Sequence, residues 1–327
     1  MSLQIIRAGI LDSIQDLGRY GYQHLGINPT GAMDRFAASL ANALLGKELS
    51  APVIELHFPS AKIHFEKPAI FSLAGGNFSP TVNQLPVPMY QPIAVAENSV
   101  LEFIHIEKGF RTYVSLLPEL KIDRWLESFS TNMKAGAGGF HGRALMKNDR
   151  IEFSKTLNLD DILKEKRSAV IHLKAAEIPM ENKTIECVMG SEWNRLTMDG
   201  QEAFVNGWFE ITPDSDRMGY RLKGREIGLK RKDQMVSSPA GFGTIQVLPN
   251  GQLIILMADH QTTGGYPKVG HVIMADLPLL AQKAPGTVIK FKMTELASAE
   301  KKWLSQQAYL RQIQEAAGTR MREIFLM

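Results

Sequence analysis

Short strand-like segments, spaced roughly ten residues apart, dominate this chain. They are rich in β-branched and aromatic residues and are bounded by Gly, Pro or Asn, the pattern of β-strands separated by turns. Strands at this spacing favour barrels or sandwiches over alternating strands and helices. We therefore predict a mainly β fold with a few helices. The predicted strands are 53–58, 62–65, 69–73, 100–106, 112–117, 169–173, 185–189, 209–212, 244–248, 253–257 and 288–293.

Helical patterns are few. Apolar residues in 33–45 follow the i, i+3, i+4, i+7 spacing of one buried helix face, and Gly46 is a suitable stop. A second pattern covers 272–282, where Pro278 is expected to distort the helix. A third begins near Glu295 and continues to the end of the sequence as an amphipathic helix.

The length of 327 residues is large for one hydrophobic core and predicts two domains. A polar stretch places the boundary near residue 180, which gives domains 1–180 and 181–327. Asp16 followed by Gly21-Tyr22 recurs as Asp214 followed by Gly219-Tyr220, a faint echo of the kind that a duplicated domain leaves. The sequence thus favours two similar units.

Charge and cysteine content narrow the class of protein. A formal net charge of +3 argues against a nucleic-acid or membrane surface. The single cysteine, Cys187, lies in a predicted strand, which indicates a buried thiol in a reducing compartment. The N-terminus lacks the apolar core of a signal peptide, and no apolar run approaches the length of a membrane span. We expect a cytoplasmic protein.

The polar loop 259–268 (DHQTTGGYPK) is the most informative candidate site. It follows an apolar strand candidate and precedes a helical pattern that begins near Gly270. Its two glycines permit unusual backbone geometry, its threonines supply hydroxyls, and Lys268 supplies a cation. Such a loop can hold an anionic or amide-bearing ligand at a helix N-terminus. An ordinary turn between a strand and a helix explains the same residues.

Charged loops elsewhere are further candidates. The segment 15–35 carries two Asp-Arg sets close to the predicted start of a helix, where local salt bridges and a helix cap are the alternative interpretation. In 213–221, Asp214 and Asp216 can orient Arg217 toward a carboxylate or phosphate. A solvated turn with Asx-type hydrogen bonds is the alternative there.

Two weaker candidates remain. The glycine-rich segment 134–143 can form a backbone nest for an anion, although such turns are common between strands. Asn77 and Ser79, followed by the proline-rich stretch 86–90, offer neutral donors and acceptors beside an extended wall. A hairpin without a ligand explains this segment equally well. The sequence contains no phosphate-binding P-loop, no HExxH and no GxSxG motif, and its dispersed histidines predict no metal site.

Together these segments resemble the carboxyltransferase-like family that includes the C-type subunit of 5-oxoprolinase, the proteins called allophanate hydrolase subunit 2, and the Kip-type antagonist of a sporulation kinase inhibitor. The matching segments, in family order over nearly the whole chain, are 14–19 (IQDLGR), 31–35 (GAMDR), 78–81 (FSPT), 86–89 (PVPM), 136–140 (GAGGF), 142–144 (GRA), 215–221 (SDRMGYR), 245–247 (IQV), 261–268 (QTTGGYPK) and 275–278 (ADLP). This chain departs from the family at His260, where an arginine is usual, and in 116–124, which lacks the expected glycine pair.

The resemblance implies two related cyclophilin-like β-barrel units. It also implies two partner proteins, one similar to allophanate hydrolase subunit 1 and one of the LamB/YcsF type. With the first of these partners, the chain is expected to phosphorylate the lactam of 5-oxo-L-proline before ring opening to glutamate, and to be inactive alone. The implied cofactor is ATP with Mg at or near the partner interface, whereas biotin is not expected.

Lactam phosphorylation requires positive charge around the transferred phosphoryl group and groups that orient the ligand. We assign the catalytic roles to Lys268, Arg217 and Asp214. Asp16, Asp34 and Asp214 are expected to orient the cations. The residues assigned to substrate or nucleotide binding are Thr262, Thr263, Gly264, Gly265, Tyr266, Asp16, Arg19, Asp34, Arg35, Asp216, Tyr220, Asn77 and Ser79.

Two other functions are compatible with the sequence. The first is a regulatory binding protein that antagonises a kinase-inhibitor partner without turnover, which fits the missing nucleotide motif. The second, ranked lower, is a biotin-dependent carboxyltransferase or allophanate hydrolase-like activity on urea-like substrates. Carboxyl transfer needs a separate carrier protein, because the chain has no Met-Lys-Met biotin-attachment segment.

Overall fold

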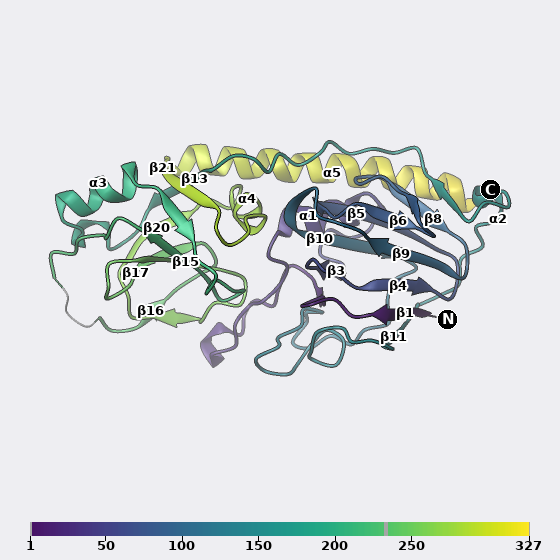
Figure 1. Ribbon diagram of the computed structural model, residues 1–327, viewed down its shortest axis with the longest axis horizontal. Coiled ribbons are helices and arrows are strands. Elements are labelled where there is room, and N and C mark those ends of the chain that lie inside the picture. The colour runs from purple at the N-terminus through teal and green to yellow at the C-terminus, as the bar shows by residue number, and fades with distance from the viewer. Residues whose placement is uncertain (1, 232–234, 327) are drawn as a thin grey trace. The chain divides into compact units, whose positions relative to one another are not determined.

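The structure is a computed structural model that describes residues 2–231 and 235–326 (Figure 1). The chain forms two compact units, and each has its own core. Unit 1 comprises Met1–Gly18, Asp34–Ile178 and Gln307–Met327, and unit 2 comprises Arg19–Met33 and Pro179–Gln306. The predicted subdomain boundary at residue 180 stays a prediction.

Unit 1 contains two antiparallel six-stranded sheets within the described residues, with the orders β11-β1-β4-β9-β6-β7 and β12-β8-β5-β10-β3-β2. The strands of the first sheet are β1 (Ser2–Arg7), β4 (Lys62–Phe65), β6 (Pro80–Val82), β7 (Leu85–Pro86), β9 (Ser99–Phe103) and β11 (Arg150–Glu152). Those of the second are β2 (Ser13–Gln15), β3 (Val53–Leu56), β5 (Ala69–Asn77), β8 (Pro92–Val95), β10 (Lys108–Leu117) and β12 (Ser168–Val170).

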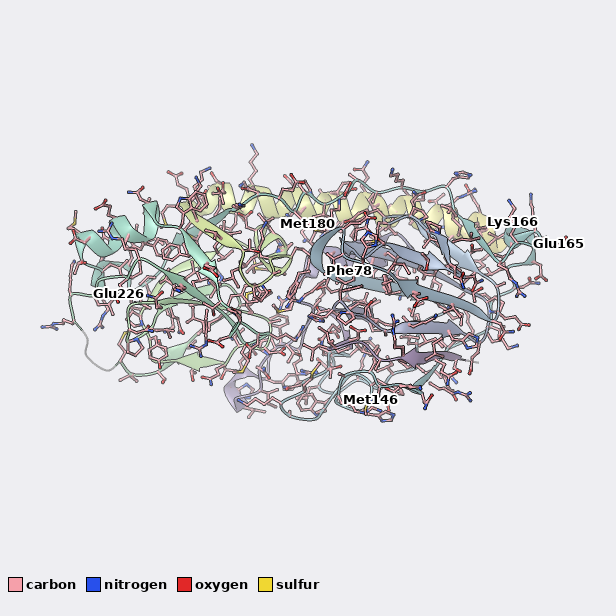
Figure 2. All side chains as sticks on the ribbon, viewed as in Figure 1. Phe78, Met146, Glu165, Lys166, Met180 and Glu226 are labelled. Carbon is pink, nitrogen blue, oxygen red and sulfur yellow. The ribbon has the colours of Figure 1, made fainter. Side chains whose placement is uncertain are left out.

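The burial of these strands follows their sequences. Along β4, Ile63 and Phe65 are buried while the intervening polar residues are partly exposed, as expected for a strand with one solvated face. The central strand β5 is buried over almost its whole length, which fits its continuous run of apolar and small residues. Side chains fill the interior of each unit (Figure 2).

Helix α1 (Arg35–Ala43) lies against β5 and β10 within unit 1. Asp34 is its N-cap, and its Oδ1 accepts a hydrogen bond from the Ala37 N–H at 2.8 Å. Gly46 follows the helix with φ of 65°, a conformation that favours glycine. A Cβ at Gly46 would lie 2.7 Å from the Cα of Gly318, so this glycine also permits close packing of the C-terminal helix. Unit 1 also contains the short helix α2 (Asp160–Leu163).

Unit 2 is built around a closed barrel with the strand order β13-β20-β17-β18-β15-β14-β21 in the part of the chain that is described. β13 and β21 pair in parallel, and the other neighbours pair antiparallel. The barrel strands are β13 (Thr184–Met189), β14 (Phe209–Ile211), β15 (Gly219–Gly224), β17 (Thr244–Val247), β18 (Leu253–Leu256), β20 (Lys268–Val272) and β21 (Val288–Met293). The remaining elements are β16 (Ser238–Pro239), β19 (Thr263–Gly264), 3-10 helices at Gln23–Leu25 and Trp193–Arg195, and helices α3 (Met198–Asn206) and α4 (Leu277–Ala281).

The barrel core is apolar and includes the cysteine. Phe204, Phe209 and Phe291 pack against one another, with ring centroids 4.8 and 5.6 Å from Phe291. Cys187 is buried in the same core, and burial raises the pKa of its thiol to about 12. A thiol with so high a pKa is a poor nucleophile at neutral pH, which agrees with the predicted buried strand position.

The mainly β prediction is confirmed, and two strands, 62–65 and 288–293, match their predicted bounds. The helix predicted over 272–282 is wrong in its first half, because Val272 ends strand β20 and residues 273–276 form a turn before helix α4. Helix α4 begins at Leu277 and has Pro278 in its first turn, where a proline needs no hydrogen-bond donor. The polar loop therefore leads into a barrel strand, and the helix N-terminus expected at this position is replaced by β20.

The third helix is confirmed as α5 (Leu296–Leu326). Its residues up to Gln306 belong to unit 2, and those from Gln307 onward belong to unit 1. Within the described chain, none of the helices combines the length and the apolar character that crossing a bilayer requires.

Candidate functional site

A cavity of about 640 Å³ lies in unit 2 against barrel strands β15, β17 and β18. It is lined by Asp214, Asp216, Met218, Gly219, Arg221, Met235, Ser237, Gln246, Leu248, Ile254, Leu256, Gln261, Thr263, Gly264, Gly265 and Tyr266. This mixture of an apolar wall with a few polar groups is typical of small-molecule sites. Two loops singled out from the sequence, 259–268 and 213–221, both contribute to it.

The threonine–glycine loop forms one wall of this cavity. Thr263 and Gly264 make the short strand β19, in which Gly264 pairs with Ser238 of β16. Gly265 and Tyr266 continue the wall. Thr262 does not line the cavity but helps to fix the loop, because its backbone carbonyl accepts a hydrogen bond from the Ala240 N–H at 3.1 Å.

Lys268 supports the loop from behind. Its side chain is buried, and its ammonium donates hydrogen bonds to the Ser238 hydroxyl and, at 3.4 Å, to the Gly264 carbonyl. Its backbone N–H donates to Glu192 Oε2 at 2.8 Å. The cation is thus outside the cavity lining and acts on the cavity through Gly264.

Gln246 lines the same cavity and was not selected from the sequence. Its side chain is buried, and its amide nitrogen has no hydrogen-bond partner in the described protein. A buried donor without a partner is costly, and a ligand carbonyl or carboxylate oxygen can satisfy it. The signal in the sequence is a polar residue between Ile245 and Val247 in a buried strand, which becomes informative once the barrel register is known.

The aspartate–arginine turn differs from its prediction. Asp214 lines the cavity, but the Oδ1 atom of Asp216 accepts hydrogen bonds from the Met218 and Gly219 N–H groups at 2.7 and 3.1 Å. This arrangement is the Asx-type turn that was the alternative interpretation. The prediction that Asp216 orients Arg217 is therefore wrong, because its carboxylate is turned toward the backbone.

Arg217 is bound to a different carboxylate. Its Nε and Nη2 atoms donate to Asp259 Oδ2 and Oδ1 at 2.9 and 3.1 Å, and Nη2 also donates to the Gly31 carbonyl at 2.7 Å. Only 6% of the Arg217 side chain and 18% of the Asp259 side chain are exposed, so this ion pair is largely shielded from water. Within unit 2, Arg217 thus links Asp259 to the Gly31 carbonyl, and its predicted catalytic role stays a prediction. Tyr220 is likewise part of the barrel core.

The charges of segment 15–35 have structural partners. Asp16 accepts hydrogen bonds from the Ser128 and Ser130 hydroxyls and from the Phe129 and Gly18 N–H groups. Its carboxylate therefore organises unit 1 loops, and the expectation that it orients a cation is wrong.

The other residues of this segment lie near the start of α1 or in unit 2. Asp34 caps α1, which was the alternative interpretation, and Arg35 is the first residue of that helix. Arg19 belongs to unit 2 and is 1% exposed; its Nη1 donates to Thr30 Oγ1 at 2.7 Å. The segment thus contributes to the packing of both units.

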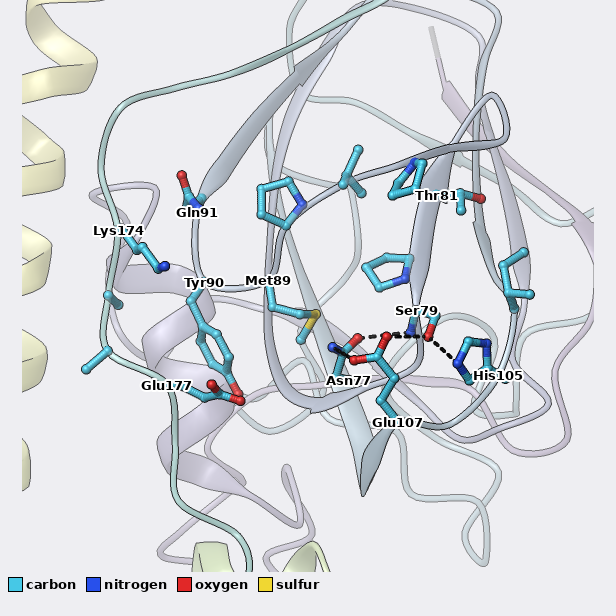
Figure 3. A pocket seen from close by; sticks show the side chains of 17 residues that line it. Asn77, Ser79, Thr81, Met89, Tyr90, Gln91, His105, Glu107, Lys174 and Glu177 are labelled. Atoms are coloured by element: carbon cyan, nitrogen blue, oxygen red, sulfur yellow. Dashed lines mark hydrogen bonds between the residues drawn. The ribbon is translucent and has the colours of Figure 1, made fainter.

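Asn77 and Ser79 line a second cavity, of about 650 Å³, that lies entirely in unit 1 (Figure 3). They form a hydrogen-bonded group with His105 and Glu107. The structure therefore places the predicted site residues in two cavities, one in each unit, together with a set of structural positions.

Comparison with known proteins defines the family. The model of the family described as "Carboxyltransferase domain, subdomain A and B" matches residues 25–293. The chain belongs to this family. It is 35% identical over 301 residues to the C-type subunit of 5-oxoprolinase from Haemophilus influenzae, covering 92% of this chain and 94% of that protein. It is 32% identical over 311 residues to the C-type subunit of 5-oxoprolinase from Escherichia coli, covering 95% and 97%.

The carboxyltransferase-domain fold is also found in solved structures. The crystal structure of the Kluyveromyces lactis urea amidolyase matches 95% of this chain with a TM-score of 0.86 and 23% sequence identity. The match covers 20% of that much longer chain, so this likeness concerns the fold alone.

Proposed function

We propose that this carboxyltransferase-domain chain is the C-type subunit of an ATP-dependent 5-oxoprolinase. The observation that carries the proposal is its 35% identity with such a protein over nearly the full length of both chains. The name of that relative implies an assembly of several subunits. The proposed partners of this chain are a protein similar to allophanate hydrolase subunit 1 and a LamB/YcsF-type protein.

Lactam hydrolysis explains why such an enzyme uses ATP. The nitrogen lone pair of a lactam is delocalised onto the carbonyl, which makes the carbon a poor electrophile. Transfer of the γ-phosphoryl group from ATP to the carbonyl oxygen breaks the bond from the γ-phosphorus to the bridging oxygen and releases ADP. Loss of the N–H proton then leaves a phosphorylated imidate, whose carbon water can attack, with phosphate as the later leaving group. The protein must then hold the lactam and the phosphoryl group together and balance the charge on the phosphoryl oxygens.

We assign ligand binding to the unit 2 cavity. Thr263 and the unpartnered Gln246 amide supply neutral hydrogen-bonding groups, and Asp214 supplies a carboxylate to the lining. Lys268 stabilises negative charge near the loop from its buried position behind Gly264. ATP with Mg is expected to bind at or near the surface that faces the partner similar to allophanate hydrolase subunit 1, which brings further charged groups.

Replacement of Lys268 provides the first test. We expect Lys268→Met to lower 5-oxoproline-dependent ATP hydrolysis about tenfold in a complex reconstituted with the two partner proteins, because one charged donor behind the loop is lost. Lys223→Met is the matched control, since Lys223 is an exposed residue of β15. The measurement is phosphate release with and without 5-oxo-L-proline.

The outcomes separate the candidate functions. Unchanged turnover of Lys268→Met would remove this residue from the mechanism. A wild-type complex that shows no 5-oxoproline-dependent hydrolysis would contradict the proposed function. Tight partner binding without turnover would then favour the regulatory binding protein, and capture of a biotinylated carrier would favour the carboxyltransferase.

A further inference from the structure

The unit 1 cavity contains a polar group that the proposed function does not use. Asn77 lies at the end of β5, Ser79 lies between β5 and β6, and Glu107 and His105 lie between β9 and β10. The Ser79 hydroxyl donates to Glu107 Oε1 at 2.9 Å, and Asn77 Nδ2 donates to Glu107 Oε2 (Figure 3). Side chains from two connections between strands thus converge on one carboxylate.

The backbone of Ser79 supports a functional role for this group. Ser79 has φ of 51°, a left-handed conformation that costs energy in a residue with a side chain. Asn77 Oδ1 accepts a hydrogen bond from the Ser79 N–H at 2.9 Å and helps to hold this conformation. The strained backbone therefore keeps the hydroxyl beside Glu107.

This arrangement favours binding over nucleophilic catalysis. His105 Nε2 lies 3.1 Å from Ser79 Oγ, which resembles a serine–histidine pair. In a catalytic triad, however, the carboxylate orients the imidazole, whereas Glu107 accepts from the serine hydroxyl itself. The Ser79 hydroxyl proton is thus directed to the Glu107 carboxylate. The cluster is therefore better suited to present acceptor oxygens to a ligand than to activate Ser79 as a nucleophile.

Glu107 has acceptor capacity to spare. Asn77 and Ser79 are neutral donors to it, and the two oxygens of a carboxylate can accept about four hydrogen bonds. Glu107 is exposed at the cavity. A ligand N–H group is therefore a suitable additional partner. Lys174, which also lines the cavity, supplies a donor for a ligand oxygen (Figure 3).

Part of the remaining wall is apolar and stiff, although Thr81, Gln91 and Glu177 also line the cavity. The apolar part is made by Pro80, Pro86, Val87, Pro88, Met89 and Ile104. Prolines restrict the backbone, so this wall is largely preformed and favours a compact ring over a flexible chain. Met89 adapts its side chain to the edge of a ring.

We propose that the unit 1 cavity is a second small-molecule site, which takes a compact cyclic amide or cyclic urea through an N–H group that donates to Glu107. The N–H requirement follows from the unit 1 contacts, while the choice of a lactam ring rests on the proposed function. The site is distinct from the unit 2 cavity, with which it shares no lining residue among those that the structure describes.

The test uses two ligands that differ at one position. 2-Pyrrolidinone carries the ring N–H, and N-methyl-2-pyrrolidinone lacks it. Saturation-transfer NMR on the full chain should show binding of 2-pyrrolidinone and at least about tenfold weaker binding of the N-methyl compound. Glu107→Gln should weaken 2-pyrrolidinone binding by about the same factor, because a charge-assisted hydrogen bond is lost.

Two control variants locate the effect. Glu97→Gln is the matched control in unit 1, because Glu97 is exposed, pairs with Lys67 at 3.0 Å and does not line the cavity. Gln246→Ala weakens the ligand site assigned to the unit 2 cavity, so in this background Glu107→Gln should still weaken the remaining 2-pyrrolidinone binding by about tenfold. The proposal is overturned if neither ligand binds, if both bind equally, or if Glu107→Gln binds as the wild type does.

These results are independent of the ATP hydrolysis assay. Suppose that a reconstituted complex hydrolyses ATP with 5-oxoproline, while 2-pyrrolidinone binds equally to the wild type and to Glu107→Gln. These results would contradict this inference alone. A complex without such hydrolysis, together with N–H-dependent binding at Glu107, would contradict the proposed function alone.

Discussion

Asp259→Ala should destabilise unit 2 by about 3 kcal/mol, at the lower end of the range for removing one partner of a buried ion pair. The Asp259 side chain is 18% exposed and forms two hydrogen bonds with Arg217, of which 6% is exposed. Without Asp259, the guanidinium keeps its hydrogen bond to the Gly31 carbonyl but loses the two hydrogen bonds to the Asp259 carboxylate. Loss of a carboxylate that pairs with a buried cation is unfavourable, so the folded state rises in free energy.

The measurement is urea unfolding followed by tryptophan fluorescence. Trp193, Trp208 and Trp303 belong to unit 2 and Trp125 belongs to unit 1, so the signal reports mainly on unit 2. Glu210→Ala is the matched control, because Glu210 is exposed on β14 and should change stability by less than about 0.5 kcal/mol. Equal losses of stability in the two variants would show that the Asp259 pair contributes no more than a surface carboxylate.

Some strands were predictable because the residue pattern that specifies them lies within the strand itself. The segments 62–65 and 288–293 have the alternation and β-branched content of strands, and both were found at their predicted bounds. The segment 270–272 was assigned to a helix because short apolar runs fit a strand and a helix equally well. Its state is decided by pairing with β13 and β17, which are distant in the sequence.

The sequence predicted which loops line the candidate site better than it predicted the side-chain contacts within them. The sequence identified 259–268 and 213–221, and both line one cavity. Adjacency in the sequence suggested that Asp216 orients Arg217, yet the carboxylate that accepts hydrogen bonds from Arg217 within unit 2 is Asp259, which is 42 residues away. Local backbone hydrogen bonds compete for an aspartate in a turn, and that competition determines the partners of Asp216 here.

Gln246 shows a second limit of sequence interpretation. A glutamine within a strand carries no functional signal until the barrel register places it in a buried position facing a cavity. Its significance comes from the unpartnered amide and from the absence of a side chain at Gly264 beside it. Both are properties of segments brought together by the fold.

Gly264→Ala should reduce 5-oxoproline-dependent ATP hydrolysis of the reconstituted complex by about 100-fold while changing stability by less than about 1 kcal/mol. A Cβ at Gly264 would lie 2.6 Å from the Gln246 amide nitrogen. Gly264 does not have positive φ, so alanine causes no backbone strain. The contact is relieved by movement of the glutamine amide, which displaces the ligand-binding donor while the barrel stays intact.

The matched control is Gly241→Ala, because a Cβ there would have its nearest neighbour, His271 Cε1, at 4.0 Å. Gly241 lies in unit 2, is not among the cavity-lining residues and should retain wild-type turnover and stability. The double variant Gly264→Ala/Gln246→Ala gives the decisive comparison. If the amide position matters, the second substitution should cost little more than the first. Wild-type turnover in Gly264→Ala would instead show that neither the loop nor the amide orients the reacting ligand, and the unit 2 cavity would lose its assigned role.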